Sequence, residues 1–275
     1  MCLLVLGWRA HPRWRIVVAA NRDEFHGRAA TAAAVWPDAP HLLGGRDRQA
    51  GGTWLAIGRD RRFGIVTNYR ERAQPQPGAP SRGALIPGYL GAAAGAGGFL
   101  ESLAGDAARY SGFNLLLGDA ESLWFASNRG APFARPLDPG IHGLSNHTLD
   151  TPWPKLLRVR AGFEAALATH DGSAGDLRAA LLAILADRTR QPPGSSPDTG
   201  SGLSAEWEHV LSSAFVHHPE YGTRCSTVLL LGHDGSAEFI ERRFDAAGEP
   251  AGDAEWRLNP GEWPVCGNPS HAPRL

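Results

Sequence analysis

The first half of the chain alternates short apolar runs with glycine, proline and charged residues. Runs of this length bounded by turn-forming residues are typical of buried β-strands. Such runs occupy residues 2–7, 15–20, 53–58, 63–69, 113–117, 122–127 and 141–146. The pattern therefore predicts that the N-terminal half is built mainly of strands.

Helical spacing of apolar side chains is clearest after residue 150. Four of them recur at intervals of three or four residues: Leu156, Val159, Phe163 and Leu167. Because Thr151-Pro152 precedes them, they predict a helix over about 153–169. Further helical segments are expected over 83–90, 98–110, 174–186 and 205–212.

The last third of the chain returns to strand-like runs. Residues 226–232 and 237–243 are expected to form a hairpin around a turn at 233–236. Strands followed by helices and again by strands favour the α+β class over an alternating parallel fold. A stretch at about 191–204 is rich in proline, glycine and serine, which predicts an exposed loop rather than a domain boundary. We therefore expect residues 1–275 to form a single domain.

Composition narrows the function classes. The formal net charge is −1 and the isoelectric point is about 6.8, with arginines scattered rather than clustered, so neither nucleic acid nor an anionic membrane surface is an expected partner. The apolar runs are too short for a transmembrane segment. Three dispersed cysteines predict reduced thiols, and no metal-binding motif is present. These features predict a cytoplasmic protein without a metal centre.

Cys2 follows the initiator Met1, and its small side chain is of the type that permits removal of Met1. A first-position cysteine carries a thiol nucleophile and an α-amine whose ordinary pKa is about 8, so the amine can act as a base near neutral pH. This is the chemistry of N-terminal-nucleophile hydrolases. The alternative is that Cys2 is only a small buried hydrophobe.

Four polar residues, Asn21-Arg22-Asp23-Glu24, directly follow the apolar run at 15–20. In isolation such a cluster is typical of a turn with a surface ion pair. A hairpin with its turn near residue 12, however, places residue 2 opposite about residue 22. Cys2 is therefore expected to lie beside Asn21, Arg22 and Asp23.

Ordered motifs along nearly the whole chain, this cluster included, resemble the Asn-Arg-Asp-Glu (NRDE) family, also called the Transport and Golgi organisation protein 2 family. The matching blocks are 1–2, 19–25, 51–55, 67–69, 111–115, 128–130, 143–146, 151–155 and 221–224. The family is in turn similar to N-terminal-nucleophile hydrolases of the choloylglycine hydrolase and penicillin V acylase type. The resemblance implies an α+β fold arranged as a four-layer αββα sandwich.

The resemblance also implies catalytic roles for particular residues. Cys2 would be the nucleophile, its own α-amine the base, and Asp23 the carboxylate that orients that amine. Asn146 matches an oxyanion-stabilising asparagine, and Asn68 is a second candidate donor. Arg224 resembles a late arginine that lowers the pKa of the thiol. These roles suit cleavage of a linear carbon–nitrogen amide bond through a Cys2 thioester, without a cofactor.

Six further residues are candidates for binding the substrate, a small amide or acyl compound: Asn21, Arg22, Glu24, Trp54, Tyr69 and Trp153. The chain departs from the bile-salt-cleaving hydrolases in one respect. They carry an arginine immediately before the asparagine of the motif, where this chain has Ala20. Arg22 shares a strand face with Ala20 and is a candidate substitute for that arginine.

Family members are also associated with haem mobilisation and with lipid or acyl-coenzyme A homeostasis. Under this alternative the pocket binds an apolar ligand without catalysis, and the candidate haem contacts are Cys2, His217 and His218. A third alternative, a purely structural or interaction protein, is disfavoured because a compact polar set is costly to bury without function. The sequence does not fix the oligomeric state.

Overall fold

The computed structural model describes residues 2–71, 78–170, 173–192 and 202–265. They belong to a mixed protein of antiparallel sheets and a few helices, and they group into two compact units. The first unit contains residues 2–27 and Pro139–Glu262, and the second contains Arg28–Asp138 with residues 263–265. The second unit is therefore inserted in the sequence of the first.

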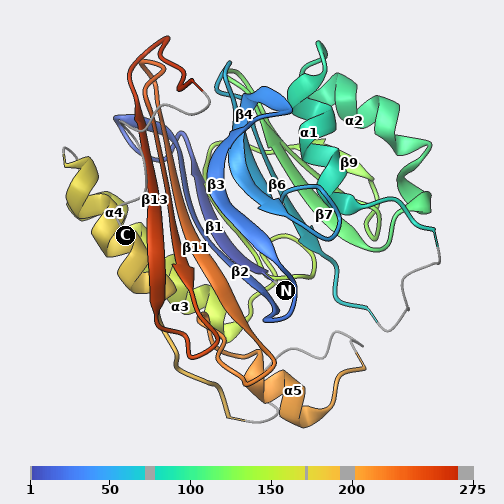
Figure 1. Ribbon diagram of the computed structural model, residues 1–275, viewed down its shortest axis with the longest axis vertical. Coiled ribbons are helices and arrows are strands. Elements are labelled where there is room, and N and C mark those ends of the chain that lie inside the picture. Colours follow the sequence, from blue (N-terminus) through green and yellow to red (C-terminus); the bar gives the residue numbers. More distant parts are fainter. Residues whose placement is uncertain (1, 72–77, 171–172, 193–201, 266–275) are drawn as a thin grey trace. The chain divides into compact units, whose positions relative to one another are not determined.

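The first unit is built on a six-stranded antiparallel sheet (Figure 1). The strands are β1 (Cys2–Trp8), β2 (Trp14–Phe25), β10 (Gly140–Leu144), β11 (Tyr221–Gly232), β12 (Ala237–Phe244) and β13 (Pro250–Leu258). Their order across the sheet is β10-β1-β2-β11-β12-β13. The N-terminal hairpin β1–β2 therefore occupies the middle of a sheet completed by the C-terminal third of the chain.

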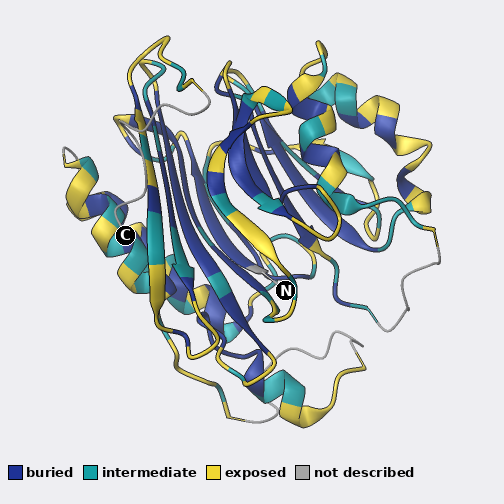
Figure 2. Ribbon diagram, viewed as in Figure 1, coloured by how far each residue is buried: buried dark blue, intermediate teal, exposed yellow. Residues whose placement is uncertain are grey.

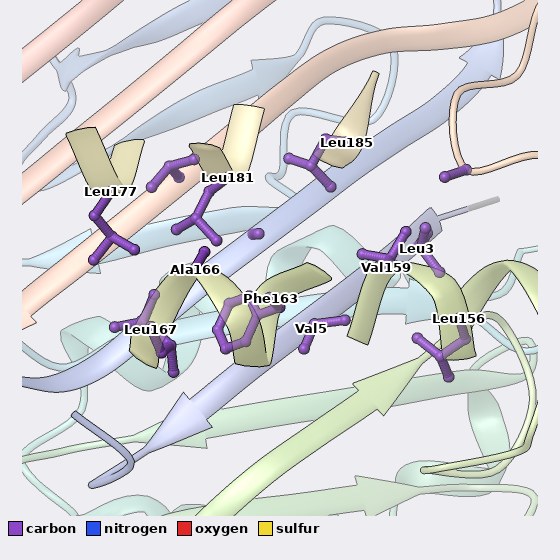
Figure 3. Close-up of a cluster of buried hydrophobic side chains, with 14 of the residues drawn as sticks. Leu3, Val5, Leu156, Val159, Phe163, Ala166, Leu167, Leu177, Leu181 and Leu185 are labelled. Atoms are coloured by element: carbon purple, nitrogen blue, oxygen red, sulfur yellow. The ribbon is translucent and has the colours of Figure 1, made fainter. Parts of the chain in front are cut away.

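The helices of the first unit are α3 (Pro154–Thr169), α4 (Ala174–Leu185) and α5 (Ala205–Val210). Pro154 opens α3 at a position where its missing N–H costs no hydrogen bond, and the Ser173 side chain caps α4 by accepting from the Asp176 amide. α3 and α4 bury their apolar stripes against β1, β2 and β11, as Figure 3 shows for Phe163 and Leu181. Figure 2 shows these three strands buried along most of their length. This core holds the N-terminal hairpin in place.

The odd positions of the N-terminal hairpin face these helices. Leu3, Val5, Val17 and Ala19 all belong to the helix-facing core. Side chains alternate between the two faces of a strand, so the odd positions that follow on β2 point to the same side. Asn21 and Asp23 are therefore directed toward the helices.

The second unit is built on a seven-stranded antiparallel sheet in which the strands follow chain order. They are β3 (Ala30–Trp36), β4 (Ala39–Asp47), β5 (Leu55–Gly58), β6 (Phe63–Asn68), β7 (Phe113–Gly118), β8 (Leu123–Ser127) and β9 (Ala134–Pro136). Two helices and two 3₁₀ turns accompany them: η1 (Arg82–Ala84), α1 (Leu85–Gly91), α2 (Ala96–Ala104) and η2 (Ala107–Arg109). Ile86, Tyr89 and Leu100 of the helices pack with the sheet residues Leu42, Leu115 and Leu117.

The predicted α+β class is confirmed, and so are the predicted strands of the N-terminal hairpin and the predicted long helix. The helix expected over 98–110 was wrong in extent, because α2 ends at Ala104 and a separate 3₁₀ turn follows. Four strands, β3, β4, β9 and β13, were missed. Of the predicted loop at 191–204, residues 193–201 lie outside the described residues, and the single domain over 1–275 stays a prediction. No helix within the described ranges is long and apolar enough to cross a membrane.

Candidate active site

Backbone pairing of three strands builds the candidate site. In the β1–β2 register Cys2 is opposite Arg22, which confirms the pairing predicted from the hairpin. On the other side of β2, Thr223 of β11 is opposite Asp23. A β-bulge then follows, so that Arg22 faces Cys225 and Arg224 is the extra residue. The second residue of the chain and the start of β11 therefore flank the same segment of β2.

Asp23 is a buried acid at the centre of this segment. Asp23 is only 1% exposed, like the apolar residues of the core. The Thr223 hydroxyl donates to Asp23 Oδ1 over 2.7 Å, and the Tyr221 hydroxyl donates to the Asp23 carbonyl over 2.9 Å. Burial raises the pKa of Asp23, and the charges of the chain's N-terminus, Lys155 and Arg22, together with the Thr223 hydrogen bond, oppose that rise.

Lys155 was not among the predicted site residues. It lies in the first turn of α3, it is only 2% exposed, and its Nζ donates to the Leu211 carbonyl over 2.7 Å. A sequence signal for it does exist, because Lys155 stands four residues before Val159 on the apolar stripe that continues to Phe163. A charged residue in such a stripe indicates a buried partner of opposite charge.

Asn21 makes three buried side-chain hydrogen bonds. Its Nδ2 donates to the carbonyls of Leu185 (2.8 Å) and Ala214 (2.9 Å). Its Oδ1 accepts from the Ser226 hydroxyl over 2.6 Å. These bonds tie β2 to the end of α4, to the segment before β11 and to β11 itself. The predicted substrate contact of Asn21 stays a prediction.

The charged side chains around Asp23 have different surroundings. Arg22 Nη2 lies 4.0 Å from Glu24 Oε2, with side-chain exposures of 7% and 19%. Arg224 Nη1 donates to the carbonyls of Phe25 (3.2 Å) and His26 (2.8 Å), so the bulge residue holds the end of β2. The effect of Arg224 on a thiol pKa stays a prediction.

Asn146 follows the edge strand β10. Leu144 is opposite Leu4 in the β10–β1 register, so Asn146 comes two residues after this pair while Cys2 lies two residues before it. Asn146 is 1% exposed and has a φ of 59°, a left-handed conformation that asparagine tolerates better than most residues. Trp153, 3% exposed, packs edge-on against His147. The backbone thus brings Asn146 to the end of the sheet where β1 begins.

Three predicted site residues belong to the second unit: Trp54, Asn68 and Tyr69. Asn68 is the last residue of β6 and is exposed, opposite Phe113 of β7. The Tyr69 amide donates to the Gly112 carbonyl over 2.9 Å, and burial, with the charge of Glu71, raises the pKa of the Tyr69 hydroxyl. The roles of these three residues beside Cys2 stay predictions.

The paired histidines lie just before β11. The His218 ring packs on Trp207 with 4.9 Å between ring centroids, and the His218 carbonyl contacts His26 Nε2 at 3.0 Å. His217 is exposed, and its carbonyl accepts from Arg190 Nη2 over 2.7 Å. Haem ligation by His217 and His218 stays a prediction.

The fold and the site together define an α+β protein in which an Asn-Arg-Asp-Glu strand pairs with a strand that begins at a second-position cysteine. The chain belongs to the Transport and Golgi organisation 2 family, whose model matches residues 1–246. This match confirms the resemblance inferred from the ordered motifs.

Named relatives extend the match over most of the chain. The Transport and Golgi organization 2 homolog of Mus musculus is 31% identical over 256 residues, which cover 88% of this chain and 92% of the relative. The corresponding Homo sapiens protein is 32% identical over 258 residues, with the same coverage. Transport and Golgi organization protein 2 of Drosophila melanogaster is 30% identical over 277 residues, covering 93% of this chain and 95% of the relative.

Proposed function

We propose that this protein is an N-terminal cysteine amidohydrolase that cleaves a linear carbon–nitrogen amide bond of a small molecule in the cytoplasm. The observation that carries the proposal is the pairing of Cys2 with Arg22, immediately beside the buried carboxyl of Asp23. A buried acid next to the start of a central strand suits the orientation of a terminal amine. The similarity of the NRDE family to N-terminal-nucleophile hydrolases points to the same reaction.

The proposal includes the four-layer αββα arrangement of those hydrolases. Two features support it: the first sheet packs α3 and α4 on one face, and the second sheet packs α1 and α2. A sheet with helices on one face has its other face free to pack against another sheet.

In the proposed reaction, removal of Met1 exposes the α-amine of Cys2. The amine takes the thiol proton, the thiolate attacks the amide carbon, and a tetrahedral oxyanion forms. An amide donor from Asn146 stabilises that oxyanion by about 3 kcal/mol. The carbon–nitrogen bond then breaks, the leaving amine takes the proton, and water hydrolyses the Cys2 thioester to release the acid.

Intact mass of the protein from its native host, measured beside turnover of a panel of acyl amides, tests this proposal. The expected result is a mass that lacks Met1 and release of an amine from at least one acyl amide. An active protein that retains Met1 would overturn the mechanism, because its α-amine would belong to methionine rather than to Cys2.

A second candidate function is that of a non-catalytic carrier of haem, a lipid or an acyl-coenzyme A. The observation that favours it is an aromatic cluster beside the NRDE motif: Phe25, 54% exposed, packs edge-on against Tyr221, which in turn contacts Trp207.

Titration with haem tests the carrier function. A carrier should show a saturable Soret shift that weakens in Cys2→Ala or in the His217→Ala/His218→Ala double variant. A shift that is the same in all three proteins would exclude the proposed ligands.

A further inference from the structure

Lys155 is a buried cation to which the proposed reaction assigns no role. It is 2% exposed, and its Nζ donates to the Leu211 carbonyl, which is a neutral acceptor. A charged ammonium is costly to bury unless an opposite charge lies nearby. We therefore expect an acidic side chain near Lys155.

The segment 211–216 links Lys155 to the acid of the NRDE motif. Its carbonyls accept from Lys155 Nζ (2.7 Å) and from Asn21 Nδ2 (2.9 Å), and its last amide donates to Thr223 Oγ1 (2.9 Å). Thr223 Oγ1 in turn donates to Asp23 Oδ1 over 2.7 Å. Asp23 is on the helix-facing side of β2, like Asn21, and Lys155 is on the sheet-facing stripe of α3. One short segment thus positions both the lysine and the acid.

We propose that Lys155 is the charge partner of Asp23 and keeps this carboxyl ionised. The inference deepens the proposed function and rests on it for its catalytic meaning, because only an ionised Asp23 can orient a terminal ammonium. The other groups that act on Asp23 are the N-terminal ammonium of the chain, the Arg22 guanidinium and the Thr223 hydroxyl. Arg22 is an adjacent residue on the same strand and points to the other face, whereas Lys155 lies on the helix side. Lys155 is a positioning residue and does not contact the reacting atoms.

A carbon-13 NMR titration of the Asp23 carboxyl tests this role without any substrate. Lys155→Met should raise the apparent pKa of Asp23 by about 1–3 units, because an opposite charge at short range favours the ionised form. Lys155→Arg retains the charge. Its apparent Asp23 pKa should therefore differ from that of the native protein by no more than about half of the shift seen in Lys155→Met. The matched control is Arg178→Met, which removes a cation of α4 that pairs with Glu238. This variant should leave the apparent pKa of Asp23 unchanged.

A stability cycle covers the case in which Lys155→Met folds poorly. Lys155→Met and Asp23→Asn should each lower the urea midpoint, and the double variant should be more stable than the sum of the two losses predicts, because it buries no lone charge. If Lys155→Met does not fold but the double variant does, that result also supports the pair. Additive losses would overturn it.

The outcomes separate this inference from the proposed function. An Asp23 titration that is the same in the native protein and in Lys155→Met overturns the pairing, whatever the turnover. A shifted titration in a protein that cleaves no amide supports the pairing and counts against the hydrolase. If amides are cleaved, the acid limb of the rate profile should move to higher pH in Lys155→Met but not in Lys155→Arg, since Asp23 must be ionised for activity.

Discussion

Replacing Cys2 with alanine should reduce the turnover of acyl amides by about 10⁴-fold or more, the scale seen when a covalent nucleophile is removed. Alanine leaves the terminal amine in place but supplies no atom to form the thioester. Cys2→Ser should show a loss of similar size, because a hydroxyl is far less acidic than a thiol and the amine of this site is matched to the thiol. The measurement is release of the amine product, followed at neutral pH with each purified variant.

Two controls make the Cys2 result specific. Cys225→Ala removes a buried thiol from β11 and should retain turnover of the same order as the native protein. The thermal midpoint of each Cys2 variant should match that of the native protein, so that lost activity is not lost folding. Equal turnover in native protein and Cys2→Ala would show that the residue is not the nucleophile and would favour the carrier function.

Replacing Asn21 with alanine should lower the free energy of unfolding by about 3–9 kcal/mol. The change removes three side-chain hydrogen bonds of 2.6–2.9 Å and leaves two carbonyls and the Ser226 hydroxyl buried without that partner. Each buried group left unsatisfied costs about 1–3 kcal/mol. Urea unfolding followed by tryptophan fluorescence measures the loss.

The matched control for this loss is Asn259→Ala, an exposed asparagine whose side chain contacts Glu262. It should change the free energy of unfolding by no more than about 0.5 kcal/mol. If Asn21→Ala were as mild as Asn259→Ala, the three bonds would not be what holds β2 to α4 and β11.

These expectations assign different roles to neighbouring residues of one motif. Asn21 and Asp23 both face the helices, yet Asn21 bonds to main-chain carbonyls and to Ser226, while Asp23 combines a buried charge with a hydroxyl donor. Variants of the two residues should therefore fail in different ways. Asn21 variants should lose stability, and Asp23 variants should change the charge balance around Lys155.

The local pattern of apolar and polar residues was sufficient to predict much of the secondary structure of the first unit. The apolar runs of β1 and β2 are short, unbroken and separated by a short loop, so both the strands and the opposition of Cys2 and Arg22 followed from the sequence. β3 and β13 were missed because their sequences, ATAAAVW and PAGDAEWRL, contain mainly alanine, polar or charged residues. Such strands are specified by their neighbours in the sheet more than by their own propensity.

The rest of the site depends on contacts between distant parts of the chain. Thr223 and Asp23 are separated by 200 residues, and no local pattern specifies their register or the bulge at Arg224. Lys155 was missed for a related reason, because its significance appears only when α3 is packed on the sheet. Its position on the apolar stripe was nevertheless readable in the sequence.

The insertion of the second unit also sets the order in which the site is completed during synthesis. β2 leaves the ribosome early, but its partner β11 begins only at Tyr221, after the whole of Arg28–Asp138. At about 5–20 residues per second, roughly 10–40 s separate the two strands. For that interval Asp23 lacks its hydrogen bond from Thr223, and the beginning of β1 belongs to an unfinished sheet. The proposed chemistry requires the removal of Met1, and this interval leaves time for that removal before β11 pairs with β2.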